Sequence, residues 1–125
     1  MSEKTSINIR VEDVLKLAKD KYLMHEGEES TEMYYVQSGS LAVIKRKGAG
    51  EQIIGNIYGG ELVGEISFLD KKPRSATVKA LSDCELIAIP HGKLNSYMKT
   101  LAPWFTALIR TLVDRLRHAN AKIKV

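Results

Sequence analysis

Short apolar runs separated by glycine-containing turns are the feature that most constrains the fold of this chain. Between about residues 21 and 90, runs such as 33–36 and 41–44 are brief and stop at turn residues. The turn Ser38-Gly39-Ser40 between these two runs predicts a β-hairpin, and the turn at residues 47–50 leads into a further predicted strand at 52–57. Many short strands joined by glycine turns are typical of a sandwich, barrel or jelly roll.

Helical spacing flanks this β-region on both sides. Before it, Val11, Val14, Leu15 and Ala18 recur with the spacing of one helix face, which predicts a helix over about residues 9–19. After it, the pattern predicts one helix from His91 and a second from Pro103, since proline suits a first helical turn. We therefore expect a single mainly β domain over residues 1–125. Its eight-stranded, jelly-roll-like β-roll would span about 21–90, with an N-terminal helix and two C-terminal helices over about 91–124.

The last predicted helix carries two apolar stripes. One stripe has the 4-3-4-3-4 spacing of a heptad seam and consists of Phe105, Ile109, Leu112, Leu116, Ala119 and Ile123. The second stripe consists of Trp104, Leu108 and Val113. One stripe can pack on the β-region and the other on a partner, so we predict a parallel homodimer through residues 103–124.

Cysteine usage and hydropathy indicate a cytoplasmic protein. Cys84 is the one cysteine, which excludes an intramolecular disulfide and fits an intracellular setting. Residues 1–10 contain no apolar signal core, and no window approaches the roughly 20 apolar residues of a membrane span. We therefore expect cytoplasmic localisation and no membrane contact.

Charge and polar spacing argue against nucleic-acid binding, metal binding and catalysis. The net charge is +4, but five basic residues crowd the last sixteen positions, as on a solvated helix face, and no DNA-reading motif is present. His25, His91 and His118 are far apart, although a metal site needs clustered ligands. With no acid–base pair for catalysis either, we expect no metal, no cofactor and no enzymatic activity.

The stretch from residue 59 to 78 combines the groups that a sugar phosphate needs. Glycines at positions 59, 60 and 64 allow the backbone to approach a ligand closely. Residues 66–69 could form a helical turn whose first N–H groups favour an anion. Arg74 can bind a phosphate with two parallel hydrogen bonds, and Glu65 can accept hydrogen bonds from ribose hydroxyls. Taken singly, an arginine is usually a surface charge and a Gly-Glu pair is usually a turn.

The same stretch resembles the phosphate-binding cassette of the cyclic-nucleotide-binding domains, found in catabolite activator proteins and regulatory subunits of protein kinase A. The matching residues, in order, are Gly64, Glu65, Ser67, Arg74, Ala76 and Thr77. Upstream, residues 26–28 resemble the Glu-Gly-Asp turn of the family, and residues 34–39 resemble its aromatic strand and turn. Two departures stand out: Ser30-Thr31 replaces a common Gly-Asp, and Ser67 replaces a common alanine.

The resemblance implies a role for each cassette residue. Glu65 would accept the ribose 2′-hydroxyl and Arg74 would pair with the cyclic phosphate. Backbone amides near Ile66 and Ser67 would bind the phosphate, and Gly64 would allow close approach. Ser75 could add a hydroxyl, and Ala76 would stay small with its amide facing the phosphate. In the family the last helix lies beside the base, so Asn120 and His118 are candidate base contacts, with plain helix surface as the alternative.

These inferences together predict a non-enzymatic sensor of a 3′,5′-cyclic nucleotide that signals through its C-terminal helix. Cyclic AMP (cAMP) is favoured, and cyclic GMP (cGMP) stays open because Ser75 is compatible with either base. Two alternatives remain on the same fold. The chain could be a nucleotide-independent interaction module, or a regulatory fragment whose effector lies outside it.

Overall fold

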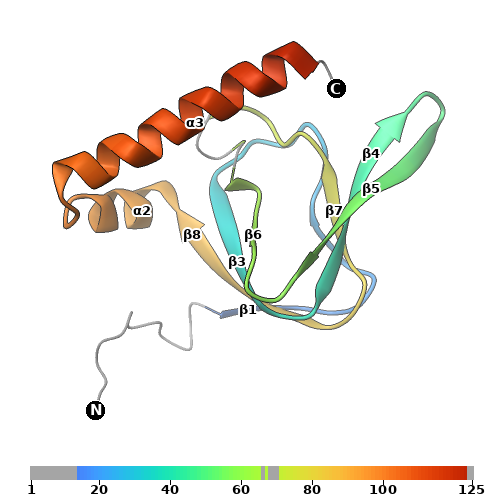
Figure 1. The fold of residues 1–125 in the computed structure, drawn as a ribbon. Helices are drawn as coiled ribbons and strands as arrows, with labels where there is room; N and C mark the ends of the chain where they lie inside the picture. The colour runs from blue at the N-terminus through green and yellow to red at the C-terminus, as the bar shows by residue number, and fades with distance from the viewer. Residues whose placement is uncertain (1–13, 66, 68–70, 124–125) are drawn as a thin grey trace.

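The computed structural model describes residues 14–65, 67 and 71–123, and eight strands in these residues form two antiparallel sheets (Figure 1). In spatial order, the first sheet contains β1 (Val14–Leu17), β8 (Cys84–Pro90), β3 (Glu32–Ser38) and β6 (Leu62–Val63). The second contains β2 (Tyr22–Met24), β7 (Thr77–Ala80), β4 (Ser40–Lys47) and β5 (Gly50–Tyr58). The predicted eight-stranded β-roll is confirmed.

Strands β3 and β4 follow one another in the chain but lie in different sheets. The hairpin predicted between residues 33–36 and 41–44 is therefore wrong, although both strands are present. Gly39 between them has a φ of 100°, and a Cβ there would lie 2.6 Å from the Asp83 carbonyl oxygen and from Cys84 Sγ. Because glycine has no side chain, the chain can turn here from one sheet to the other. Instead, β4 forms a hairpin with β5 through the predicted turn at residues 47–50.

The N-terminal helix predicted over about residues 9–19 is wrong where the structure describes it. Residues Val14–Leu17 form β1, which pairs antiparallel with β8, and residues 9–13 lie outside the described residues. Helical spacing is compatible with these residues locally, but β8 offers unpaired backbone groups along one edge. Hydrogen bonding to β8 and packing of Leu17 against the core outweigh the local helical pattern.

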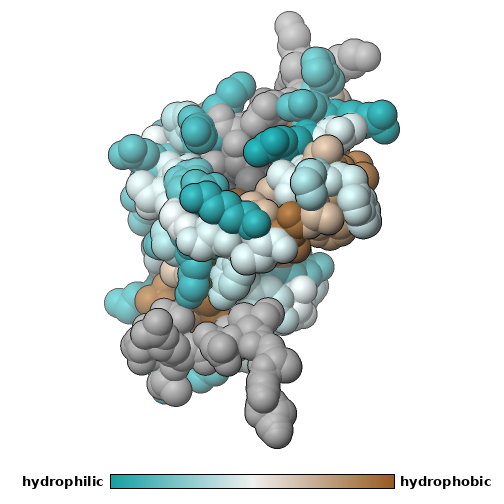
Figure 2. All heavy atoms as spheres, turned by 90° about the vertical axis from the view of Figure 1, so that its left-hand side faces the viewer, coloured by the Kyte–Doolittle hydropathy of each residue, from teal (hydrophilic) through white to brown (hydrophobic). Residues whose placement is uncertain are grey.

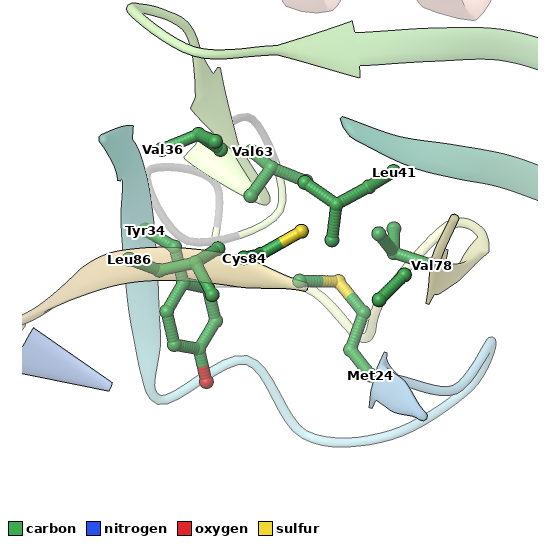
Figure 3. Close-up of a cluster of buried hydrophobic side chains, with 9 residues drawn as sticks. Met24, Tyr34, Val36, Leu41, Val63, Val78, Cys84 and Leu86 are labelled. Atoms are coloured by element: carbon green, nitrogen blue, oxygen red, sulfur yellow. The ribbon is translucent and has the colours of Figure 1, made fainter. Parts of the chain in front are cut away.

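Side chains from both sheets meet in one apolar core (Figure 3). Val36 and Leu86 point inward from the first sheet and Leu41 from the second, and all three are completely buried. The whole cluster consists of Met24, Tyr34, Val36, Leu41, Val63, Val78, Ala80, Cys84 and Leu86. Cys84 is 2% exposed and packs as a small apolar residue, as the sequence predicts.

The two predicted C-terminal helices are confirmed as α2 (His91–Met98) and α3 (Pro103–Ile123). The second is about 31 Å long at 1.5 Å per residue, and it runs past one end of the roll (Figure 1). No residue of α2 is buried, and large apolar side chains of α3 face outward. On the face shown in Figure 2, hydrophobic surface lies among hydrophilic residues. None of the described helices is long and apolar enough to cross a membrane.

Candidate functional site

Six of the seven predicted pocket residues line one cavity of about 660 Å³, a volume typical of small-molecule sites. They are Gly64, Glu65, Ser67, Arg74, Ser75 and Ala76. The seventh, Ile66, lies outside the described residues. Residues 64–67 follow β6 in the first sheet, and residues 74–76 precede β7 in the second. The cavity therefore forms where the two sheets bring these short segments together.

The backbone of Arg74 is held by the turn at residues 26–28. The Arg74 amide donates to the Glu28 carbonyl at 2.8 Å, and the Gly27 amide donates to the Arg74 carbonyl at 2.8 Å. Gly27 has a φ of 91°, which glycine adopts without steric cost. The Glu26 amide donates to Thr77 Oγ1 at 2.9 Å. This turn thus fixes the chain on both sides of the arginine.

The side chain of Arg74 is 5% exposed, and backbone carbonyls compensate its buried charge. Nη1 donates to the Gly64 carbonyl at 3.1 Å, and Nη2 donates to the Glu32 carbonyl. The guanidinium carbon lies 5.9 Å from the centre of the Tyr34 ring, within the range of a cation–π contact. A guanidinium has five N–H donors, so these two carbonyls leave capacity for an anion.

Gly64 is required by both its conformation and its neighbours. Its φ is 77°, and a Cβ there would lie 2.5 Å from Arg74 Nη1 and 3.0 Å from Met24 Cε. Any side chain at this position would therefore push the guanidinium out of its place. The sequence points to close backbone approach at Gly64, and the structure identifies the arginine itself as the group that comes close.

Two hydroxyls complete the surroundings of the arginine. Ser67 Oγ lies 3.5 Å from Arg74 Nη1 and 3.4 Å from the Gly64 carbonyl oxygen. It also donates to Ser30 Oγ at 3.3 Å. The two positions at which this chain departs from the common family residues are therefore in direct contact.

Tyr34 lies beneath the arginine as a neutral hydrogen-bond donor. Its hydroxyl donates to Glu32 Oε1 at 2.7 Å. Burial, together with this hydrogen bond to a carboxylate, raises the pKa of Tyr34 well above its ordinary value. The phenol therefore keeps its proton at neutral pH and leaves the positive charge of Arg74 for an anion.

Two carboxylates line the cavity, and the structure distinguishes them. Glu61 Oε1 accepts a hydrogen bond from the Tyr58 amide at 2.8 Å, so this side chain closes the turn between β5 and β6. Glu65 is half-buried and stands on the same segment as Gly64 and Ser67. The position of Glu65 next to the buried cation suits an acceptor for hydroxyls of an anionic ligand.

Sequence reasoning missed the apolar wall of the cavity and one lysine beside it. Met24, Val43, Ile57, Val63 and Val78 line the wall, which offers a flat ring an apolar surface. Alternation along β4 and β5 is the signal that could have indicated Val43 and Ile57. Outside this wall, Lys45 donates to the Ser75 carbonyl at 2.7 Å and lies 3.8 Å from Glu26 Oε2. The sequence signal that could have indicated Lys45 is a cationic residue within strand β4.

The two candidate base contacts on α3 stay predictions. His118 is exposed, and its Nδ1 lies 2.9 Å from the Asp114 carbonyl of its own helix. The Asn120 side chain lies outside the described residues. The described lining of the cavity comes from residues before β8 and includes no residue of α3. In the described part of the chain, no three His, Cys, Asp or Glu side chains cluster as a metal site would need.

Comparison with known proteins extends this picture. The family described as "Cyclic nucleotide-binding domain" matches residues 14–100. A curated relative, patatin-like phospholipase domain-containing protein 7 of Rattus norvegicus, is 31% identical over 105 residues, which are 83% of this chain and 8% of that protein. The cAMP-activated global transcriptional regulator CRP of Salmonella typhimurium is 29% identical over 103 residues, or 81% and 49% of the two chains. The chain thus spans less than half of these relatives.

Solved structures agree with the sequence relatives. The EAL enzyme Bd1971 in its halfsite-occupied form has a TM-score of 0.77 and 27% identity, covering 86% of this chain and 96% of that one. The Thermus thermophilus catabolite activator protein has a TM-score of 0.72 and 28% identity, covering 88% and 52%. Bd1971 has also been solved in a cAMP bound form and in a cGMP bound form.

Proposed function

The chain belongs to the cyclic nucleotide-binding domain family, and from this premise we propose that it is a non-enzymatic sensor of a 3′,5′-cyclic nucleotide, preferentially cAMP. The observation that carries the proposal is the cavity that joins Glu65 to the buried guanidinium of Arg74. A cyclic phosphate is a compact anion, and its adjoining ribose presents a 2′-hydroxyl. The spacing of one cation and one carboxylate across a single segment suits that pair of groups.

Each part of the nucleotide has a partner in this proposal. Arg74 and the backbone amides at residues 66 and 67 bind the cyclic phosphate, and Ala76 keeps space for it. Glu65 accepts the ribose 2′-hydroxyl, and Ser75 adds a hydroxyl near the phosphate or base. The purine lies against the apolar wall of Val43 and Ile57, where ring burial stabilises the complex. His118 and Asn120 reach the base only if α3 lies over the cavity.

The first experiment is calorimetric titration of the wild-type chain with cAMP, cGMP and the non-cyclic nucleotide 5′-AMP. We expect both cyclic nucleotides to bind more tightly than 5′-AMP, with cAMP the tighter of the two. The relative named as cAMP-activated supports that order, whereas Bd1971 has been solved with either nucleotide. Equal or tighter cGMP binding would reverse the preference, and no binding of either would favour an interaction module.

The role of Glu65 has its own test with 2′-deoxy-cAMP. Loss of the 2′-hydroxyl and substitution Glu65→Gln should each weaken binding by about 1.5–3 kcal/mol, as for a hydrogen bond to a charged group. Together they should cost no more than either alone, since both remove one interaction. Additive losses would place the 2′-hydroxyl elsewhere. Glu61→Gln is the matched control. The Glu61 side chain closes a turn instead of facing the ribose, so this variant should leave the affinity unchanged.

The signal leaves the domain through α3. Phe105, Leu112 and Leu116 of the heptad seam are exposed, so apolar surface is available for a second copy of this chain. We infer a parallel homodimer through residues 103–124. In this proposal, bound nucleotide shifts the position of α3 and so changes the stability of the dimer. Sedimentation at micromolar concentration tests this. A monomer with and without cAMP would contradict it.

A second candidate function follows from how much of each relative the chain spans. The matched part is 8% of the patatin-like phospholipase domain-containing protein and 49% of the CRP regulator. The domain can therefore act as the regulatory part of a larger effector. We propose that it does so in the cytoplasm, without contacting nucleic acid or membrane itself. Fusion of the domain to a reporter enzyme, assayed with and without cAMP, tests whether the domain can control an attached effector.

A further inference from the structure

Ser30, Ser67 and Arg74 are the buried polar or charged side chains among the described residues, and they form one chain of contacts. Their exposed fractions are 8%, 8% and 5%. Arg74 Nη1 lies 3.5 Å from Ser67 Oγ, and Ser67 Oγ lies 3.3 Å from Ser30 Oγ. Buried polar groups persist when they satisfy one another, so this chain of contacts is a built feature of the interior.

Ser30 reaches the site from a distant part of the sequence. It precedes β3 and lies 37 residues from Ser67, outside the segment that carries the cassette. It also lines a second cavity of about 670 Å³, together with Lys71, Pro73 and His91. Ser67 lines the first cavity and Ser30 lines the second, so the hydrogen-bonded pair connects the walls of the two cavities. Nothing in the local pattern of residues 59–78 indicates Ser30.

The chemistry of the hydroxyl gives Ser30 a definite role. A serine hydroxyl has one hydrogen to donate and two lone pairs to accept with. When Ser67 donates its hydrogen to Ser30, its lone pairs remain for Arg74 Nη1. Without Ser30, the remaining acceptor near Ser67 is the Gly64 carbonyl, at 3.4 Å. That carbonyl already accepts from Arg74 Nη1 at 3.1 Å, so Ser67 would have to share this acceptor with the arginine.

We propose that Ser30 is a positioning residue for phosphate recognition, acting through Ser67 to keep Arg74 in place. Ser30 accepts the Ser67 hydrogen, Ser67 accepts from Arg74, and the Gly64 carbonyl stays available to the guanidinium. The inference rests on the proposed function and adds to it a residue outside the cassette. The two departures from the family residues act as one unit, because Ser67 donates to Ser30 and lies within reach of Arg74 Nη1.

The test is the dissociation constant for cAMP, measured by calorimetry on the whole chain. Ser30→Ala should weaken binding about 2- to 10-fold, the range of one ordinary hydrogen bond. Ser30→Thr should restore wild-type affinity, because it keeps the hydroxyl and its methyl can enter the second cavity. Ser82→Ala is the matched control: its hydroxyl accepts from the Ser40 amide, far from the cassette, and its loss should leave the affinity unchanged.

Two cycles separate positioning from a general loss of stability. Ser30→Ala combined with Ser67→Ala should bind cAMP no more weakly than Ser67→Ala alone. In an Arg74→Lys background, Ser30→Ala should have no further effect on the dissociation constant. Lysine lacks the planar guanidinium that reaches the Gly64 carbonyl and Ser67 Oγ. Full additivity in either cycle, or an unchanged dissociation constant in Ser30→Ala, would overturn the inference while leaving the proposed function intact. Failure of the wild-type chain to bind any cyclic nucleotide would overturn both.

Discussion

The β-roll and α3 contain similar apolar residues but bury them to different extents. In the roll, Val36, Leu41 and Leu86 are fully buried because the inner faces of two sheets pack on each other. In α3, Trp104 is 70% exposed and Leu116 is 47% exposed. The roll is therefore complete by itself and holds the cavity, whereas the helix presents surface that a partner would cover. In the proposed function, the roll recognises the ligand and α3 transmits the signal.

The largest effect should come from removing a core side chain of the roll. Leu86→Ala should lower the free energy of unfolding by about 2–5 kcal/mol, because it removes fully buried contacts and leaves a cavity. Leu112→Ala on α3 is the matched control and should cost the monomer less than about 1 kcal/mol. Urea titrations measure both. Equal losses would mean that α3 belongs to the same core and would break the comparison.

Removing the buried cation of the cavity comes next. Arg74→Ala should weaken cAMP binding by about 1.5–3 kcal/mol, since a charge-assisted hydrogen bond to the phosphate is lost. Arg46→Ala removes the same charge from an exposed position of β4 and should leave the affinity near that of wild type. Calorimetry reads out both variants. An unchanged affinity in Arg74→Ala would refute the assignment of the pocket.

A charge on the seam of α3 tests the other side of the comparison. Leu112 is 51% exposed, so its burial in two copies would stabilise a dimer by about 1–2 kcal/mol. Leu112→Glu should therefore raise the dimer dissociation constant about 10-fold, measured by sedimentation. Thr111→Glu places the same charge next to the seam and should have little effect. If both variants raise the dimer dissociation constant equally, the effect comes from added charge on α3 and not from lost apolar packing at the seam.

The smallest effect concerns the phenol beneath Arg74. Tyr34→Phe should cost about 0.5–1.5 kcal/mol of stability at neutral pH, because the hydrogen bond to Glu32 is lost. The pKa of Tyr34 is higher in the folded chain than the ordinary 10.0, so the unfolded chain releases this proton first. Wild-type stability should then fall above pH 10 by up to about 1.4 kcal/mol per pH unit.

The phenylalanine variant is the control for that pH dependence. Urea titrations of both proteins between pH 8 and pH 11 should give curves that converge as the pH rises above 10. The tyrosine proton is the difference between the two chains, so parallel curves over this range would show that the folded protein does not hold it.

The cassette illustrates how far local sequence reasoning reaches. Gly64, Glu65 and Arg74 could be assigned to one pocket because a short segment carries all three, and the structure places them around one cavity. The apolar wall of Val43 and Ile57 could not be assigned in the same way. Its position depends on the pairing of β4 with β5 and β7, which joins residues far apart in the chain.

The sequence by itself determined the features that depend on neighbours in the chain. Short apolar runs and glycine turns predicted the β-roll, proline and heptad spacing predicted the last helix, and an ordered motif indicated the ligand. These features are local because backbone conformation and side-chain spacing act over a few residues.

Only the tertiary structure decided which segments meet. It placed β3 and β4 in different sheets, paired the apolar residues of β1 with β8, and brought Ser30 to Ser67 across 37 residues. For β1 and for the β3–β4 connection, long-range hydrogen bonding and burial outweighed a weaker local preference. The tertiary structure also decided the partners of Arg74. The Gly64 and Glu32 carbonyls reach its guanidinium only when their chain segments converge in the closed roll.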